Sequence, residues 1–269
     1  MTDYTSKRLH RRLAEGNILL GLANHYPSPA VIESMGHGWD FIWIDCQHGQ
    51  TSYDSALASV RTAQGMELDT LLRVESRDPD LMGKYADMGV SAIMVPQVED
   101  AEQAEAIVRA LRYPPRGHRS FASRRLVDLV GVDHHLQPQP LIVAQIESRR
   151  ALDRVAQIIE IDGIDALFFG PDDVRLDMGL AHDTSPLDHQ ELNEAMSKTA
   201  QAARAVGKHA GIPAPTPELL TAVVDMGYQL LACGGDAGFV RVGARAQLTA
   251  LRSVLGKLGH TTSSSDAET

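Results

Sequence analysis

Two stretches decide the fold of this chain, Gln145-Ile146-Glu147 and Gly170-Pro171-Asp172-Asp173. Each follows an apolar run, residues 141–144 in the first case and residues 164–169 in the second. In both stretches a carboxylate stands where a buried strand ends and a helix begins. Because parallel strands of an α/β fold end at the same edge, the two acids are expected to meet over one cavity.

Outward from these stretches, apolar strand candidates alternate with helical patterns. The strand candidates are residues 17–23, 39–45, 70–74, 92–95, 141–146, 164–170, 208–212 and 229–234. The helical patterns that follow them are residues 28–35, 52–63, 78–88, 99–111, 151–159, 172–205, 217–226 and 236–255. Eight such units favour a closed (β/α)8 TIM barrel, an α/β fold of parallel strands with crossover helices. An open doubly wound sheet is the alternative, but no glycine-rich dinucleotide fingerprint follows the first strand.

The chain of 269 residues is expected to form a single domain. The barrel would cover residues 1–258 and include a lead-in helix at the N-terminus. Residues 112–139 interrupt the alternation and form an insertion that is long for a connection, so we expect a functional segment or a lid over the site. Residues 259–269 are polar and low in complexity, and we expect this tail to be disordered.

The composition excludes several classes of protein. A net charge of −10 argues against nucleic-acid binding, which usually needs a basic face. No apolar run approaches the roughly 20 residues of a membrane span, and the polar N-terminus lacks the apolar core of a signal peptide. The two cysteines, Cys46 and Cys233, form no CxxC pattern, which suits a cytoplasmic protein in a reducing compartment.

The carboxylates that end strands five and six are candidate metal ligands. Carboxylate oxygens with few other ligands suit a hard or borderline ion such as Mg²⁺ or Mn²⁺. Glu147 and Asp173 are therefore predicted to bind a divalent cation. Taken singly, each acid could instead cap the helix that follows it.

Other side chains at the expected strand ends have two possible roles. Arg73 could form a salt bridge to Glu75 or Asp45, or it could bind a substrate carboxylate or enolate oxygen. His48 could be an ordinary loop histidine, but Asp45 at the same strand end favours a role in the site. Cys46 and Cys233 could be nucleophiles or small buried residues, and His134-His135 is a weak metal candidate because adjacent side chains point apart.

The lysines exclude one chemical route. The five lysines are Lys7, Lys84, Lys198, Lys208 and Lys257. None falls at the C-terminal end of an expected strand, whereas an enzyme that activates a carbonyl as a Schiff base needs a lysine there. Activation of the carbonyl by a bound metal ion is the route that remains.

Taken together, these residues resemble the HpcH/HpaI family of class II, metal-dependent pyruvate aldolases. The motifs that carry the resemblance are Asp45-x-x-His48, Arg73, Arg112-Tyr113-Pro114-Pro115-x-Gly117-x-Arg119, Gln145-Ile146-Glu147 and Gly170-Pro171-x-Asp173. Their order matches the family over roughly residues 10–255, with near-matching spacing.

The resemblance implies a barrel assembled as a hexamer, a trimer of dimers. It implies that Glu147 and Asp173 hold Mg²⁺, Mn²⁺ or Co²⁺, which a pyruvate-like keto acid chelates. It implies that Arg73 contacts the enolate oxygen, and that His48 is the acid–base residue with Asp87 as its partner. Since Asp87 falls at the end of the third helix, we expect it to come from a neighbouring subunit.

The resemblance also implies the substrate shell. Gln145 would lie beside the metal and the keto acid, and Gly170, Pro171 and Asp172 would line the same place. Two departures concern the substrate more than the reaction. Cys46-Gln47 replaces the family's Gly-Glu before the histidine, and Asp172 replaces a common alanine. Asp172 could disfavour an anionic substituent, add a water-mediated metal contact or cap the helix.

The expected reaction is reversible aldol cleavage of a 4-hydroxy-2-oxo acid to pyruvate, or hydroxypyruvate, and an aldehyde. A related reaction of the same enolate is one alternative, either oxaloacetate decarboxylation or a Claisen-type citrate synthase or lyase. A non-catalytic keto-acid-binding barrel is the other.

Overall fold

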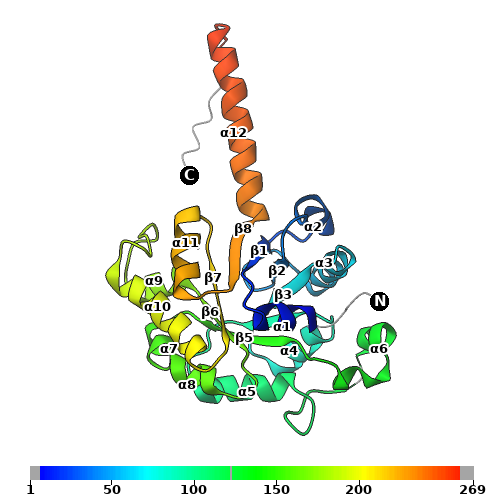
Figure 1. Cartoon of the computed structure of the whole chain (residues 1–269). Helices are drawn as coiled ribbons and strands as arrows, with labels where there is room; N and C mark the ends of the chain where they lie inside the picture. The colour runs from blue at the N-terminus through cyan, green and yellow to red at the C-terminus, as the bar shows by residue number, and fades with distance from the viewer. Residues whose placement is uncertain (1–6, 122, 261–269) are drawn as a thin grey trace.

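A computed structural model describes residues 7–121 and 123–260 and shows a closed barrel of eight parallel strands (Figure 1). The strands follow one another around the barrel in chain order, from β1 to β8, and β8 pairs with β1. The (β/α)8 prediction is confirmed. All eight strand C-termini therefore lie at one end, called the mouth below.

The strands lie within three residues of their expected bounds. They are β1 (Leu19–Asn24), β2 (Phe41–Asp45), β3 (Asp69–Arg73), β4 (Ala92–Val95), β5 (Leu141–Ile146), β6 (Ala166–Phe169), β7 (His209–Pro213) and β8 (Leu230–Gly235).

The helices also follow the expected order, but two patterns divide. Residues 151–159 belong to two short helices, α7 and α8, and the interrupted stretch 172–205 gives α9 and α10. The helices are α1 (Lys7–Ala14), α2 (Pro29–Met35), α3 (Tyr53–Gly65), α4 (Pro79–Ala86), α5 (Ala101–Leu111), α6 (Arg124–Val130), the 3₁₀ helix η1 (Val132–Leu136), α7 (Arg149–Asp153), α8 (Val155–Glu160), α9 (Pro171–Asp177), α10 (Gln190–Ala205), α11 (Pro217–Met226) and α12 (Asp236–Lys257).

Alternation along the strands separates two apolar cores. Side chains such as Phe41, Trp43 and Phe168 point inward and fill the barrel. Their neighbours, such as Ile42 and Leu167, point outward and pack under the helices. Because successive side chains of a strand face opposite sides, one sequence of apolar residues builds both cores.

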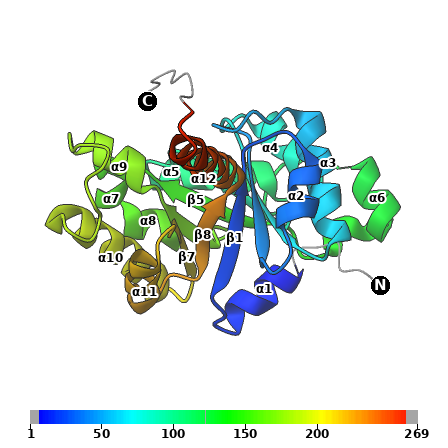
Figure 2. The same ribbon diagram turned by 90° about the horizontal axis from the view of Figure 1, so that it is seen from above.

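Helix α1 closes the barrel at the end opposite the mouth. Leu9 and Leu13 are buried and belong to the same cluster as the inward-facing strand residues. Figure 2 shows α1 below the strands, away from the end at which α12 begins. The expected lead-in helix is thus a plug, and substrate access is left to the mouth.

The insertion at residues 112–139 lies at this closed end, so its expected role as a lid is wrong within one chain. It joins the end of α5 to the start of β5, both of which are away from the mouth. Arg112 donates to the carbonyl oxygens of Pro140 and Gly163, and it pairs with Asp165 just before β6. The sequence showed the break in the alternation but not the end of the barrel on which it falls.

Helix α12 leaves the barrel instead of packing along it (Figure 1). Asp236 is its one buried residue, and residues 241–260 are all exposed. No residue of α12 belongs to either apolar core. Within the described ranges, no helix combines the length and apolar character needed to cross a membrane. The tail 261–269 lies outside the described residues.

Glycine makes room for the large rings inside the barrel. A Cβ on Gly21 would lie 2.2 Å from the Phe41 ring, and one on Gly211 would lie 2.5 Å from the Phe168 ring. Gly21→Ala should lower the free energy of unfolding by about 1–3 kcal/mol, because the interior cannot accept another methyl group. Gly83→Ala is the control. Its Cβ meets nothing within 4 Å, and it should stabilise α4 by about 0.5–1 kcal/mol. Urea denaturation measures both, and equal effects would contradict the packing argument.

Candidate active site

The carboxylate of Glu147 lies at the mouth, just after β5. The residue is only 5% exposed, and its Oε2 accepts a hydrogen bond from the backbone N–H of Gln97 at 2.8 Å. Gln97 adopts a left-handed backbone conformation, with φ of 54°, in the turn after β4. Such a conformation is strained for a residue other than glycine, and here it accompanies an N–H bonded to the carboxylate.

The surroundings of Glu147 disfavour its negatively charged form when no cation is bound. Burial raises its pKa to about 7, the N–H of Gln97 opposes this rise, and the nearby carboxylate of Asp173 adds to it. Asp173 itself is exposed, in the first turn of α9. Two neighbouring carboxylates, one of them buried, form an electrostatic arrangement that a bound cation would relieve.

Neither acid caps a helix, so that alternative is excluded. The N-cap of α7 is Ser148, whose side chain accepts from the N–H of Ala151 at 3.0 Å. The N-cap of α9 is Gly170, with no side-chain cap. Asp172 does not cap this helix either.

Gln145 and Gly170 complete the space around Glu147. A Cβ on Gly170 would lie 2.7 Å from the Glu147 Cγ and 3.4 Å from the Gln145 Nε2, so only glycine lets these groups approach. The Oε1 of Gln145 is buried and has no hydrogen-bond partner among the described residues. An orphaned amide oxygen beside two carboxylates is a donor set that fits a hard divalent cation.

The donor set is incomplete without oxygens from outside the protein. No group of three or more His, Cys, Asp or Glu residues that could hold a metal is found in the part of the chain that the structure describes. Glu147 and Asp173 would supply two ligands, and water or substrate would supply others. Mg²⁺ and Mn²⁺ tolerate this arrangement because they keep several exchangeable oxygen ligands.

Arg73 is held rigidly at the end of β3. Its Nε donates to Asp45 Oδ1 at 2.9 Å and its Nη2 donates to Asp45 Oδ2 at 2.7 Å, a bidentate pair. The guanidinium carbon lies 4.9 Å from the centre of the Trp43 ring. The predicted salt bridge to Asp45 is present, and Nη1 makes no hydrogen bond among the described residues. One edge of the fork is therefore available to a substrate oxygen.

Asp45 organises the loop that carries His48. Its Oδ1 accepts from the backbone N–H groups of Gln47 at 3.0 Å and His48 at 3.2 Å. Burial alone would raise its pKa, but Arg73 and these N–H groups lower it below the usual value. The carboxylate thus contacts the backbone of His48 rather than its ring, and His48 is exposed.

Asp87 is not brought to His48 within this chain. It ends α4, where its Oδ1 accepts from Arg119 Nη2 at 2.6 Å. It also lines a surface hollow together with Asp80 and Lys84 of the same helix. The described contacts join Asp87 to the insertion instead of the mouth, so its expected role requires a second subunit.

Asp172 points along α9. Its Oδ1 accepts from Arg175 Nη1 at 2.8 Å, and its side chain is 84% exposed. Arg175 is buried and also donates to the carbonyl oxygen of His182 at 2.7 Å. Asp172 therefore helps to fix the connection between α9 and α10, and the charge of Arg175 offsets its own.

Sequence reasoning missed one pair at the mouth, His25 and Asp236. His25 follows β1, and its Nδ1 lies 3.0 Å from Oδ1 of the buried Asp236, which follows β8. Burial would raise the pKa of Asp236, but bonds from the ring of His25 and from backbone N–H groups lower it to about 2. Each residue stands two positions beyond an expected strand end and directly after the observed strand, and this placement was the signal that could have revealed them.

The cysteines are not activated. Burial raises the pKa of the Cys46 thiol to about 12 and that of Cys233 to about 11. A thiol with such a pKa holds almost no thiolate at neutral pH, so the alternative of small buried residues is favoured.

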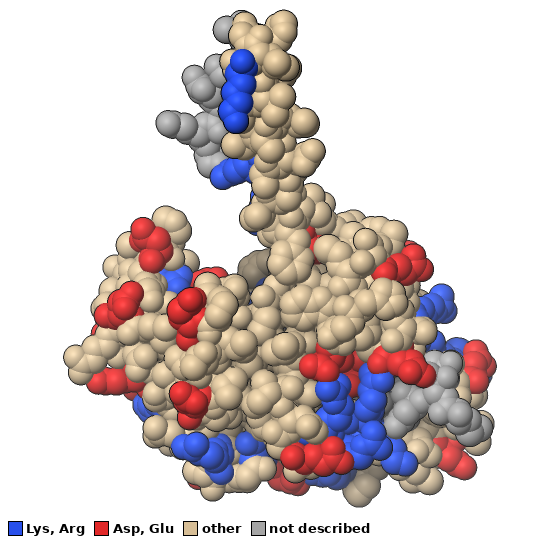
Figure 3. Space-filling view, turned by 45° about the horizontal axis from the view of Figure 1, so that its top comes forward, with Lys and Arg blue, Asp and Glu red and all other residues tan. Residues whose placement is uncertain are grey.

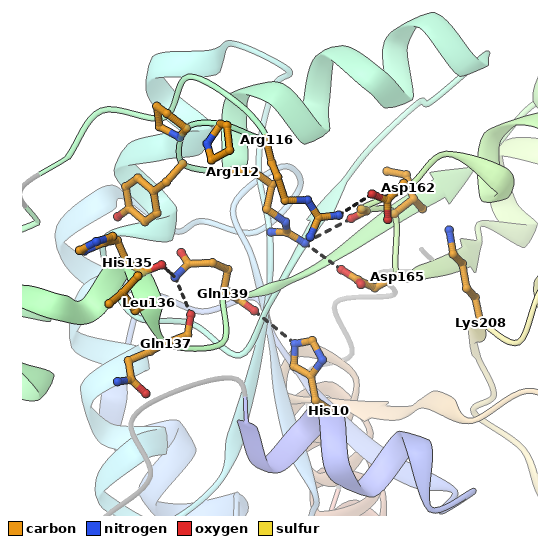
Figure 4. A pocket seen from close by; sticks show the side chains of 15 residues that line it. His10, Arg112, Arg116, His135, Leu136, Gln137, Gln139, Asp162, Asp165 and Lys208 are labelled. Atoms are coloured by element: carbon orange, nitrogen blue, oxygen red, sulfur yellow. Dashed lines mark hydrogen bonds and ion pairs between the residues drawn. The ribbon is translucent and has the colours of Figure 1, made fainter.

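A cavity of about 480 Å³ lies at the closed end of the barrel and takes no part in this site (Figure 4). Figure 4 shows Arg112 reaching Asp165 on one side, while His10 of α1 reaches Gln139. His134 and His135 belong to the same end, where His134 stacks on Phe121 with ring centres 5.1 Å apart. The weak metal candidate is thus remote from Glu147.

The closed barrel with this mouth defines an enzyme of the (β/α)8 class. The sequence model described as HpcH/HpaI aldolase/citrate lyase matches residues 25–241, and the chain belongs to this family. The expected resemblance is confirmed.

Individual relatives agree with the family match. The hydroxypyruvate/pyruvate aldolase of Delftia acidovorans is 33% identical over 244 residues, which cover 88% of this chain and 87% of the relative. The 4-hydroxy-2-oxovalerate aldolase of Novosphingobium aromaticivorans is 35% identical over 233 residues, 84% of this chain and 87% of that one. The crystal structure of the citrate synthase SbnG superposes with a TM-score of 0.80 at 25% identity, covering 91% of this chain and 97% of that chain.

Gly170 offers a test of the site that does not depend on substrate. Gly170→Ala should raise the dissociation constant for Mn²⁺ by roughly 10–100-fold, because the new Cβ displaces Glu147. Gly243→Ala, whose Cβ meets nothing within 4 Å, is the control. Calorimetric titration measures both. An unchanged affinity in Gly170→Ala would show that Glu147 does not hold the ion.

Proposed function

We propose that this enzyme is a divalent-metal-dependent aldolase that reversibly cleaves 4-hydroxy-2-oxo acids to pyruvate, or hydroxypyruvate, and an aldehyde. The observation that carries the proposal is the paired carboxylates of Glu147 and Asp173 beside the orphaned amide oxygen of Gln145. Two relatives, a hydroxypyruvate/pyruvate aldolase and a 4-hydroxy-2-oxovalerate aldolase, support the same chemistry by their names.

The residues of the mouth that the sequence predicted each have a place in this reaction. Glu147 and Asp173 would hold a divalent cation, which would supply Lewis-acid polarisation of the keto oxygen. The available edge of Arg73 donates to the oxygen on which enolate charge develops. His48 moves a proton at the methyl carbon of pyruvate. Gln145, Gly170, Pro171 and Asp172 line the keto-acid end of the site.

A second reaction of the same enolate is favoured by one finding. The likeness to a citrate synthase structure at a TM-score of 0.80 supports Claisen-type chemistry, and oxaloacetate decarboxylation needs the same groups. Product analysis separates these reactions. An aldolase releases pyruvate and an aldehyde from a 4-hydroxy-2-oxo acid, a decarboxylase releases carbon dioxide from oxaloacetate, and a citrate synthase forms citrate.

Metal removal is the first test of the aldolase. Protein stripped with a chelator should release no pyruvate from a panel of 4-hydroxy-2-oxo acids, and Mg²⁺, Mn²⁺ or Co²⁺ should restore release. Glu147→Gln and Asp173→Asn should each lower activity by roughly 100-fold or more, because each removes a charged ligand.

The controls are exposed acids of the same type, Glu160→Gln and Asp183→Asn. They should keep wild-type activity. Release that is unaffected by chelators would refute the metal, and no release with any metal would refute the aldolase.

We further propose that the enzyme works as a homo-oligomer, with a hexamer built as a trimer of dimers as the expected form. Asp87 supports this, since it lies outside the barrel and would reach a His48 only across a subunit boundary. The projecting α12 also supports it. Figure 3 shows the helix as mostly uncharged, with Lys and Arg along one side.

Four leucines, three in α12 and one at its C-cap, form an apolar stripe. Leu248, Leu251, Leu255 and Leu258 recur at spacings of three and four residues and are 38–66% exposed. This spacing places them on one stripe, which is typical of a helix that packs against another surface. A second copy of the chain is the occupant that would also bring Asp87 to the mouth.

Leu251→Glu should reduce the mass of the particle in solution at least twofold and lower aldol cleavage, because a buried charge would open the contact between copies. Ser253→Glu places the same charge on the other side of the helix and should change neither property. Sedimentation and a pyruvate assay measure the two effects. A fully active monomer would contradict this proposal.

The cytoplasm is the proposed location. Cys46 and Cys233 are free thiols, which suits a reducing compartment.

A further inference from the structure

The His25–Asp236 pair stands at the mouth and has no part in the roles given above. His25 comes directly after β1 and Asp236 directly after β8, the two strands that close the barrel. Asp236 is fully buried, and its carboxylate accepts from Asn24 Nδ2 and from the backbone N–H groups of His25, Tyr26 and Ala237. So many donors fix the carboxylate in a single position.

This fixed carboxylate orients the imidazole. Because Asp236 is an acceptor, His25 Nδ1, 3.0 Å from its Oδ1, carries the proton of that hydrogen bond. With Nδ1 as the donor, Nε2 is the ring nitrogen left to accept a proton, which is the arrangement of an acid–base histidine oriented by an aspartate. Gly235 allows the ring to lie there, since a Cβ would come within 3.2 Å of its Cε1.

The nitrogen that Asp236 leaves free lies beside the Asp45–Arg73 pair. Nε2 lies 3.9 Å from Asp45 Oδ2, the oxygen that Arg73 holds, and it makes no hydrogen bond with any residue that the structure describes. The side chain is 34% exposed, so substrate can reach it. The backbone carbonyl of His25 also accepts from the N–H of Gln50, which ties it to the loop that carries His48.

The strand order fixes which end of a substrate His25 would meet. In a closed barrel of eight strands, β1 lies opposite β5. Glu147 follows β5 and Asp173 follows β6, and these residues take the keto-acid end. A carbon chain that extends from the keto group across the barrel would pass Arg73 of β3 and reach β1 and β8, where His25 and Asp236 lie.

We propose that His25, oriented by Asp236, is the acid–base residue for the oxygen on C4 of a 4-hydroxy-2-oxo acid. The inference rests on the proposed aldolase function. In cleavage, Nε2 takes the hydroxyl proton, the C4–O bond becomes the carbonyl of the aldehyde, and the C3–C4 bond breaks. Its electron pair forms the enolate of pyruvate at C3. In the reverse reaction, aldol addition, the same proton returns to the oxygen as the C3–C4 bond forms.

The two histidines of the mouth then divide the work. His48 is exposed and receives no side-chain hydrogen bond from the described residues of its own subunit, whereas His25 has its aspartate within the same chain. His48 serves the methyl group of pyruvate at the keto-acid end, and His25 serves the aldehyde end.

Two reactions separate these roles. Cleavage of a 4-hydroxy-2-oxo acid needs both ends of the site, whereas exchange of the pyruvate methyl protons with deuterium needs only the keto-acid end. His25→Asn should lower kcat for cleavage by roughly 100-fold, a loss typical of a missing acid–base group, and leave exchange within about threefold. His48→Asn should lower both. His37→Asn, an exposed histidine at the other end of the barrel, should lower neither.

The comparison uses the metal-loaded full chain. If His25→Asn cleaves within about threefold of wild type, or if cleavage and exchange fall equally, the assignment of His25 is overturned. A wild-type protein that neither cleaves nor exchanges would instead refute the proposed aldolase. The ratio of the two rates in one preparation is unaffected by the fraction of folded protein, so a purely structural role of His25 cannot produce the expected change.

Discussion

The site depends on one buried carboxylate that faces another. Glu147 is shielded from water by the strands around it, and burial together with Asp173 raises its pKa to about 7. Gln97 supplies one N–H to the pair, from a strained backbone position, and Gly170 leaves the space in which Glu147 and Gln145 meet. This arrangement lowers the stability of the fold, and such a cost is typical of a site that binds a cation and its substrate.

Two other buried carboxylates have the opposite character. Asp45 and Asp236 are fully buried, but each is surrounded by donors, and the pKa of each is lowered. Asp45 holds Arg73, and Asp236 holds His25. These two acids are therefore fixed, and they orient the guanidinium of Arg73 and the imidazole of His25 at the mouth. Asp45 and Asp236 thus have positively charged or N–H partners within the protein, whereas Glu147 has a neighbouring carboxylate and would gain from a bound cation.

Shape connects the site to assembly. The helices of seven strand–helix units cover the barrel, whereas α12 projects from it and exposes its leucines. Asp87 lies at the end of α4, beside Arg119. A helix with an apolar stripe and an aspartate that cannot reach its histidine both indicate a missing neighbour. In the proposed oligomer, the surface of one subunit would complete the chemistry of the next.

The sequence by itself determined the barrel, because alternating strands and helices are encoded in local periodicity that needs no knowledge of distant contacts. It also determined the order in which acids, Arg73 and His48 follow the strand ends. The tertiary structure decided what depends on contacts between distant residues. It decided that Asp45 binds Arg73, that residues 112–139 lie at the closed end, that α12 projects, and that His25 meets Asp236 across the seam of β1 and β8. Barrel closure joins the first strand to the last, and no local pattern in a sequence records which side chains that closure brings together.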